Sequence, residues 1–158
     1  MNYTISNIES SDYDLIIGNL NEWWGGRNMT DMLPRLFFKH FNKTSFIIKN
    51  ETEVLGFIIG IVSQGNSPLG YVHFIGVNPN FRNKNIGKKL YHAYFDEMKN
   101  YNIKKIECVT SPDNENSITF HKNIGFIALK GNKEKNGITY FEHYDGENEH
   151  RVVFHKKL

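Results

Sequence analysis

A polar and basic turn joins an apolar strand to an amphipathic helix near the middle of the chain. The strand covers residues 71–77, and the helix begins near Ile86. Four basic residues lie on the turn and on the first turn of the helix, namely Arg82, Lys84, Lys88 and Lys89. A helix N-terminus offers backbone N–H groups without intrahelical partners and a partial positive charge. This combination predicts a docking site for a phosphate group.

The spacing of residues in the turn excludes two common phosphate-binding motifs. The turn lacks the Gly-Lys-Ser/Thr ending of a Walker loop and the G-x-G-x-x-G spacing of a dinucleotide fingerprint. The pattern that remains is Arg82-x-x-Asn85-x-Gly87, preceded by Val77 and Pro79. Asparagine is the non-glycine residue that best tolerates a positive φ, so Asn85 is compatible with a tight turn.

A second motif follows in residues 114–126. Six positions carry its pattern, namely Asn114, Ser117, Phe120, His121, Gly125 and Phe126. Together with the basic turn, this segment resembles the GNAT superfamily of acyl-CoA-dependent N-acetyltransferases, as a bacterial-type member. Two motifs in the expected order are more specific than either alone. The turn departs from the family at Asn85, where a glycine is usual.

The resemblance implies a site for acetyl-CoA as co-substrate, without a metal. Ile75 and Val77 would pair with the pantetheine arm in the manner of an added strand. Asn114 would hydrogen-bond the pantetheine side of the cofactor. The pyrophosphate would lie on the residues of the turn, namely Arg82, Asn83, Lys84, Asn85, Ile86, Gly87 and Lys88.

Acyl transfer to an amine also requires proton movements. The amine must be neutral to attack a thioester, and for a lysine-like amine at pH 7 this costs about 4–5 kcal/mol. Either a base removes the proton or the pocket lowers the amine pKa. The leaving thiolate in turn needs a proton donor.

Two histidines are candidates for these roles. The resemblance places His121 where the family usually has a tyrosine acid, and an imidazole of ordinary pKa near 6.5 could protonate the sulfur. The alternative for His121 is a packed, hydrogen-bonded core residue. His73 shares a strand face with Ile75 and Val77 and matches the working histidine of arylalkylamine N-acetyltransferases. Its alternative is a strand histidine bonded to its neighbours, and Glu107 is a weaker candidate base.

The acceptor side is expected at a break between the first two helices. Trp24 and Arg27 flank the pair Gly25-Gly26 there. Arg27 could bind a carboxylate or phosphate of the acceptor, and Trp24 could stack on a ring or an ammonium. The alternative is that Trp24 and the preceding Trp23 are both core residues and that Arg27 is solvated. Three acidic residues of a late loop could attract an amine cation or form a solvated turn: Asp145, Glu147 and Glu149.

Composition limits the class of protein. The 158 residues carry a net charge of +2, too small to argue for a nucleic-acid partner. The longest apolar run, 54–62, is too short to span a bilayer. No signal peptide is recognised, and Cys108 is the only cysteine, which excludes an intrachain disulfide and a cysteine-based metal site. A cytoplasmic protein without membrane or nucleic-acid partners is therefore expected.

The candidate residues require a sheet with flanking helices to position them. Hydrophobic periodicity and turn residues predict the order β-α-α-β-β-β-α-β-α-β-β. The expected segments are 3–5, 11–23, 34–41, 44–48, 54–63, 71–77, 86–94 or beyond, 105–110, 115–123, 139–144 and 151–155. This order predicts one mixed α/β domain over residues 1–158, with the GNAT acyl-CoA N-acyltransferase fold and its splayed pair of central strands.

The resemblance thus predicts an enzyme that moves an acetyl group from acetyl-CoA to a primary amine of a small molecule or peptide. Transfer would be direct, in a ternary complex. The alternative is a non-catalytic module that binds acyl-CoA as a sensor, because Asn85 replaces a glycine and His121 replaces a tyrosine. Either a monomer or a homodimer fits the sequence.

Overall fold

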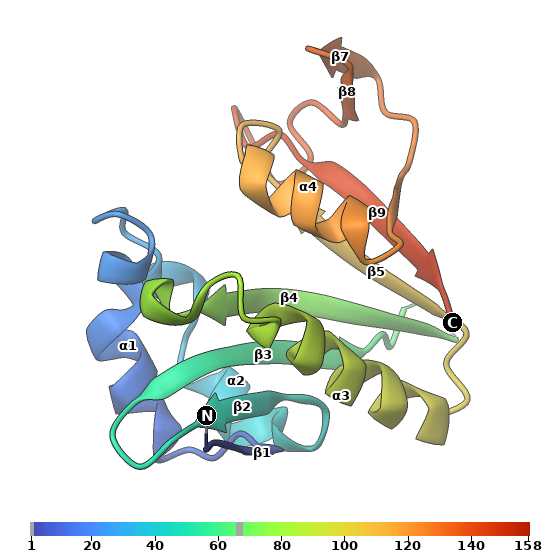
Figure 1. Ribbon diagram of the computed structural model, residues 1–158. Helices are drawn as coiled ribbons and strands as arrows, with labels where there is room; N and C mark the ends of the chain where they lie inside the picture. Colours follow the sequence, from blue (N-terminus) through green and yellow to red (C-terminus); the bar gives the residue numbers. More distant parts are fainter. Residues whose placement is uncertain (1, 66–67) are drawn as a thin grey trace. The chain divides into compact units, whose positions relative to one another are not determined.

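The computed structural model describes residues 2–65 and 68–158, and these residues form two compact units. The first unit comprises Met1–Val62 and Val72–Asn102. The second comprises Ser63–Tyr71 and Ile103–Leu158. Each unit has its own strands and helices (Figure 1).

The first unit contains strands in the order β1-β2-β3-β4. They are β1 (Thr4–Asn7), β2 (Phe46–Lys49), β3 (Val54–Val62) and β4 (Leu69–Val77), whose first three residues belong to the second unit. β1 and β3 both pair antiparallel with β2, with Ile5 opposite Ile48 and Ile47 opposite Phe57. The predicted strands of this region are confirmed, because runs of β-branched and aromatic residues suit a pleated, buried surface.

Helices cover both faces of these strands. They are α1 (Asp12–Trp23), α2 (Leu36–His40) and α3 (Ile86–Asn100). The 3-10 turns η1 (Thr30–Met32), η2 (Asn42–Thr44) and η3 (Pro79–Phe81) precede α2, β2 and α3 respectively. Figure 1 shows α3 running along β3 on one face. Gly56 and Gly60 permit this approach, because a Cβ at Gly60 would lie 2.6 Å from Cδ2 of Tyr94. On the other face, residues of α1 and α2 form a core with Phe57 and Phe74.

The second unit contains strands in the order β5-β9-β6, all antiparallel to their neighbours. They are β5 (Lys105–Thr110), β9 (Val152–Lys157) and β6 (Ile127–Ala128). A hairpin of β7 (Lys133–Lys135) and β8 (Ile138–Tyr140) forms a separate sheet, labelled in Figure 1. Helix α4 (Glu115–Asn123) is followed by Gly125, and its φ of +99° is typical of a glycine that ends a helix.

Three local expectations are wrong. The second helix is only five residues long, and it buries Phe38 while Leu36 is exposed. Ser11 and Asp14 have the spacing of a capping box in the sequence, but Ser11 makes no side-chain cap at α1. The carboxylate of Asp12 instead accepts the N–H of Glu9. Strands β6 and β7 were not expected, because neither has the apolar alternation of a longer strand.

The described residues contain no helix that is both long and apolar enough to cross a bilayer. The splay between β4 and β5 involves both units and stays a prediction, as does the single domain. Within each unit, the chain has the helices and strands of a mixed α/β fold.

Candidate functional site

The turn between β4 and α3 contains two asparagines in the left-handed region. Asn83 has a φ of 61° and Asn85 a φ of 62°. Asn85 is the N-cap residue of α3, and its side chain makes no capping hydrogen bond. The expectation that asparagine supports a positive φ at this position is therefore confirmed.

The start of the turn is fixed to the neighbouring strand. The Asn78 side chain accepts the N–H of Asn80 at 3.0 Å and donates to the carbonyl of Val54 at 3.0 Å. It also donates to Glu53 Oε1 at 3.0 Å, and the Asn78 N–H reaches the carbonyl of Leu55 at 2.9 Å. These bonds hold the end of β4 against β3 and preorganise the turn.

The beginning of α3 presents backbone donors. The first bond of the helix runs from the Lys89 N–H to the Asn85 carbonyl at 3.0 Å. The N–H groups of Ile86, Gly87 and Lys88 precede that bond and therefore have no intrahelical acceptor. Such groups, with the helix dipole behind them, suit an anion such as a pyrophosphate.

The basic side chains of the turn divide into two sets. Arg82 donates from Nη2 to the carbonyl of Trp23 at 2.8 Å, and Lys89 contacts the hydroxyl and ring of Tyr3. Lys84 lies over the ring of Phe81 at 5.3 Å, and Lys88 is exposed. Lys84 and Lys88 are therefore the more available cations, while Arg82 keeps further donors beside the one that it uses.

β4 separates its side chains onto two faces. Val72, Phe74 and Gly76 are buried, whereas His73, Ile75 and Val77 are half-buried. This alternation confirms that the three predicted residues share a face.

His73 is held by groups from the segment between α1 and α2 and from α2 itself. Its Nε2 donates to the carbonyl of Met32 at 2.6 Å, and its ring stacks on Phe37 at 4.2 Å between centroids with an angle of 11°. Burial lowers the pKa of His73 below its usual value, and the bond to Met32 opposes this shift. Because a carbonyl oxygen only accepts, the hydrogen of the neutral ring is on Nε2 and Nδ1 carries the lone pair.

The predicted acceptor residues lie at the end of α1. Trp24 is half-buried and packs on Phe74 at 5.1 Å, and it also lines the space that a Cβ at Gly76 would need. Trp23 is buried in the core beside Phe57. The Arg27 side chain is exposed and has no partner in the part of the chain that the structure describes. The two tryptophans thus differ, and only Trp23 is a core residue.

In the second unit, Asn114 is the N-cap of α4. Its Oδ1 accepts the N–H of Ser117 at 3.1 Å, which satisfies one of the unpaired donors of the helix. Its contact with pantetheine stays a prediction. Because Oδ1 already accepts the bond from Ser117, the amide nitrogen of Asn114 is the atom that would make this contact.

His121 is a buried histidine on α4, with 4% of its surface exposed. Its Nδ1 donates to the carbonyl of Ser117 at 2.7 Å, and the Ser117 hydroxyl lies 3.2 Å away. The ring stacks on Phe154 at 5.5 Å and meets the edge of Phe126 at 5.4 Å. Burial lowers the pKa of His121, opposed by the bond to Ser117. The surroundings of His121 are thus those of a packed, hydrogen-bonded core histidine, and its catalytic role stays a prediction.

Glu107 is not a solvated strand residue. It lies opposite His155 in the pairing of β5 with β9, and its Oε1 is 2.7 Å from His155 Nε2. Burial raises the pKa of the Tyr71 phenol, and the neighbouring Cys108, Tyr144, Asp145 and Glu107 add to the shift. The sequence offered no signal for this pairing, because Glu107 and His155 lie on distant strands.

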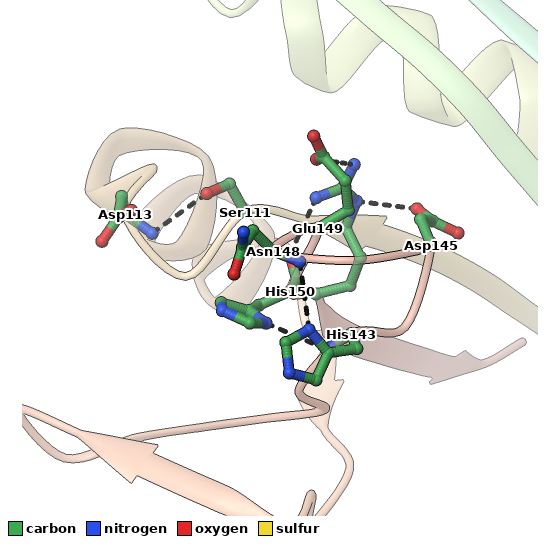
Figure 2. Close-up of polar contacts among 8 residues, drawn as sticks. Ser111, Asp113, His143, Asp145, Asn148, Glu149 and His150 are labelled. Carbon is green, nitrogen blue, oxygen red and sulfur yellow. Dashed lines mark hydrogen bonds and ion pairs between the residues drawn. The ribbon is translucent and has the colours of Figure 1, made fainter.

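Arg151 forms ion pairs with two carboxylates of the acidic loop after β8. This arginine contacts Asp145 at 2.8 Å and Glu149 at 3.1 Å, and Figure 2 shows both contacts. In the same loop, His150 Nδ1 accepts the N–H of His143 at 2.9 Å. Two of the three carboxylates expected to attract an amine therefore already have a cationic partner.

The predicted site residues fall into two groups. The first unit holds His73, Ile75, Val77, the turn from Arg82 to Lys88, Trp24 and Arg27. The second unit holds Asn114 and His121. Sequence reasoning missed two partners of His73, namely Met32 and Phe37, and it missed Arg151 as the partner of the acidic loop.

Among curated proteins, the chain is 24% identical over 93 residues to an L-2,4-diaminobutyric acid acetyltransferase from Vibrio parahaemolyticus. The match covers 59% of this chain and 50% of that protein. The chain therefore spans about half the length of the curated relative that it matches.

Solved structures with the same fold cover nearly the whole chain. The ribosomal-protein-S18-alanine N-acetyltransferase from Escherichia coli has a TM-score of 0.68 and 16% identity, over 99% of this chain and 94% of that chain. The NatC complex bound to Gag peptide and CoA has a TM-score of 0.75 and 15% identity, over 100% and 99%. These likenesses confirm the predicted fold.

The family itself is identified by a model of the Acetyltransferase (GNAT) family, which matches residues 4–126. This range contains both motifs, from the strand before the basic turn to Phe126. The chain therefore belongs to the GNAT acetyltransferase family.

Proposed function

We propose that this protein transfers an acetyl group from acetyl-CoA to a primary amine, directly and within a ternary complex. The observation that carries the proposal is the turn before α3. Its left-handed Asn83 and Asn85 lead into backbone N–H groups that precede the first helical bond. Membership of an acetyltransferase family makes the pyrophosphate of acetyl-CoA the matching anion.

The cofactor is proposed to lie along β4 and the turn. Ile75 and Val77 would offer backbone groups to the pantetheine arm, and the N–H groups at the start of α3 would bind the pyrophosphate. Lys84 and Lys88 would add charge, since neither is engaged with a carboxylate among the described residues. Asn114 is proposed to donate from its amide nitrogen to the pantetheine arm.

His73 is proposed as the base that takes the proton of the attacking amine. Its lowered pKa keeps the imidazole neutral at pH 7, and the bond from Nε2 to Met32 leaves Nδ1 as the accepting atom. A neutral imidazole can accept a proton near pH 7. The amine then attacks the thioester carbonyl, and the carbon–sulfur bond breaks.

His121 is proposed to contact the sulfur that leaves. Its Nδ1 hydrogen is held by the Ser117 carbonyl, so a proton for the thiolate would be carried on Nε2. Because burial lowers its pKa, the proton-bearing imidazolium is the minor form at pH 7. Replacement of His121 by glutamine should therefore reduce kcat more at pH 6, where more of the imidazolium is present, than at pH 8.

The acceptor is proposed to be a small amine or a peptide N-terminus. The curated relative is named for a diamino acid, and the structural relatives are named for an alanine N-terminus and a peptide complex. The exposed Arg27 guanidinium suits an acceptor that also carries a carboxylate. A cytoplasmic setting, and either a monomer or a homodimer, accompany this proposal.

The test measures release of the CoA thiol from acetyl-CoA with a panel of amines, amino acids and short peptides. We expect release with at least one amine that carries a carboxylate, and a loss of it in His73→Gln. Thermal shift with CoA provides the binding control. If CoA binds but no acceptor gives thiol release, the sensor alternative is favoured. If there is no binding and no release, an acyl-CoA site is rejected.

A further inference from the structure

We propose that Phe37 is a positioning residue for His73, and that it acts together with the backbone carbonyl of Met32. The ring of Phe37 fixes the plane of the imidazole, and the carbonyl fixes its tautomer. The inference rests on the proposed function, in which His73 accepts the proton of the amine. It adds a specific task for the segment that connects α1 to α2.

The two contacts constrain different degrees of freedom. Phe37 and His73 are nearly parallel, at 11°, with centroids 4.2 Å apart, which limits rotation of the imidazole about its terminal torsion. The 2.6 Å bond from Nε2 to the Met32 carbonyl excludes a ring flip, because a flip would present Cε1 to that oxygen. Together they leave Nδ1 as the one lone pair of a ring of defined direction.

The surroundings of the imidazole are apolar. Its ring contacts are Phe37 and Phe74, the latter at 6.2 Å between centroids. No ion pair of His73 occurs among residues 2–65 and 68–158, and the charged residues nearest to Met32 and Phe37 along the chain, Asp31, Arg35 and Lys39, are all exposed. Burial therefore dominates the lowered pKa of His73, and the aromatic face of Phe37 provides part of that burial.

The placement of these two groups connects the base to the acceptor side. Met32 ends η1 and Phe37 belongs to α2, and both follow the Gly25-Gly26 turn that carries Arg27. Any movement of this segment on acceptor binding would reach the imidazole through the carbonyl and the ring. Phe37 thus makes the basicity of His73 depend on the segment that is proposed to receive the amine.

The first test is NMR of the full-length protein with labelled ring nitrogens. We expect His73 to be protonated on Nε2 and not on Nδ1 in the wild type, with a titration midpoint below 6.5. In Phe37→Leu, water gains access to the ring, so the midpoint should rise toward the ordinary value and the second tautomer should appear. Phe37→Tyr keeps the stack and should retain the wild-type signals.

The matched control is Phe41→Leu, since the ring of Phe41 lies 5.6 Å from that of Phe37 between centroids, whereas the rings that contact the imidazole within the described part of the chain are Phe37 and Phe74. This variant should leave the His73 midpoint unchanged. A wild-type ring protonated on Nδ1, or a midpoint that is the same in Phe37→Leu and in wild type, would overturn the positioning role. Neither of these readings requires activity, so both stand whether or not the proposed function holds.

The kinetic test follows in the same variants. Phe37→Leu should lower kcat/KM for the amine by about 10- to 100-fold, which is the usual effect of a misplaced catalytic group. The acidic limb of its pH profile should move to higher pH, while KM for acetyl-CoA stays unchanged. A displaced NMR midpoint with a wild-type pH profile would refute the link to catalysis. If neither the wild type nor any variant releases the CoA thiol, the proposed function is rejected instead.

Discussion

The guanidinium of Arg82 donates a hydrogen bond from Nη2 to the backbone carbonyl of Trp23, at 2.8 Å. Trp23 is the last residue of α1, so the cation lies where the helix dipole is negative and a carbonyl lacks an intrahelical donor. The bond joins the turn proposed to bind pyrophosphate to the Trp24–Arg27 segment proposed to receive the acceptor. Arg82 is therefore both a structural link and a candidate phosphate ligand.

Replacing Arg82 by glutamine should affect folding as well as binding. We expect the free energy of unfolding to fall by about 1 kcal/mol, the scale of one hydrogen bond to a helix end. Lys84→Gln removes a charge from the same turn without such a bond, so it should change stability little. Urea unfolding and calorimetric titration with CoA separate the two effects. Equal stability of both variants would contradict a structural role for Arg82.

Asn85 offers a test of the unusual turn. Its φ of 62° is costly for a residue with a Cβ, and its side chain provides no compensating cap. Asn85→Gly should therefore raise the free energy of unfolding by up to about 1 kcal/mol, and Asn85→Ala should lower it by a similar amount. Affinity for CoA in Asn85→Gly should equal or exceed that of the wild type. A glycine variant less stable than the alanine variant would show that the left-handed conformation is not required.

The buried His121 and the half-buried His73 should make stability depend on pH. Burial lowers the pKa of both His73 and His121, so the unfolded chain binds more protons than the native state below about 6.5. The free energy of unfolding should be flat above that pH and should fall as the pH drops further. The slope contributed by one such histidine cannot exceed about 1.4 kcal/mol per pH unit.

Substitution separates the contributions to this slope. His121→Phe keeps an aromatic ring against Phe154 and removes the titrating group, so the slope between pH 5 and 6.5 should decrease. His40→Gln, at an exposed position, is the matched control and should preserve the wild-type slope. Urea midpoints at several pH values measure both. An unchanged slope in His121→Phe would mean that this residue is not buried in its neutral form.

The sequence predicts best where local signals bound an element on both sides. Strand 105–110 and helix 115–123 coincide with β5 and α4, because a Ser-Pro-Asp-Asn turn separates them and Gly125 ends the helix. Strand β7 has no apolar face, so periodicity could not reveal it. The sequence did contain one signal for this hairpin, the Asn136-Gly137 pair of its turn. Both residues have a positive φ in the structure.

The candidate site divides in the same way. The turn at Asn85 is a local structure, and its positive φ follows from residue type. The partners of His73 are Met32, which lies 41 residues away, and Phe37, which lies on a helix that the sequence placed correctly but predicted to be longer. The Arg151 contacts with Asp145 and Glu149 depend on how a loop closes after β8, which residue types alone do not specify.

A last prediction concerns Gly60, which lies on β3 where α3 approaches it. A Cβ at Gly60 would lie 2.6 Å from Cδ2 of Tyr94 and 2.9 Å from the carbonyl oxygen of Thr44. Tyr94 is fully buried, and its hydroxyl donates to the Ile61 carbonyl at 2.9 Å, so the ring has little freedom to move. Gly60→Ala should therefore destabilise the protein by about 3 kcal/mol through overpacking.

Gly18 provides the matched substitution, because it lies inside α1 and a Cβ there would meet nothing within 4 Å. Gly18→Ala should raise the free energy of unfolding by about 0.5–1 kcal/mol, since alanine loses less backbone entropy in a helix. Urea unfolding of both variants gives the comparison. If Gly60→Ala were as stable as the wild type, α3 could not lie as close to β3 as these contacts require. The packing of α3 on β3 could then not be what holds the turn before α3 in place.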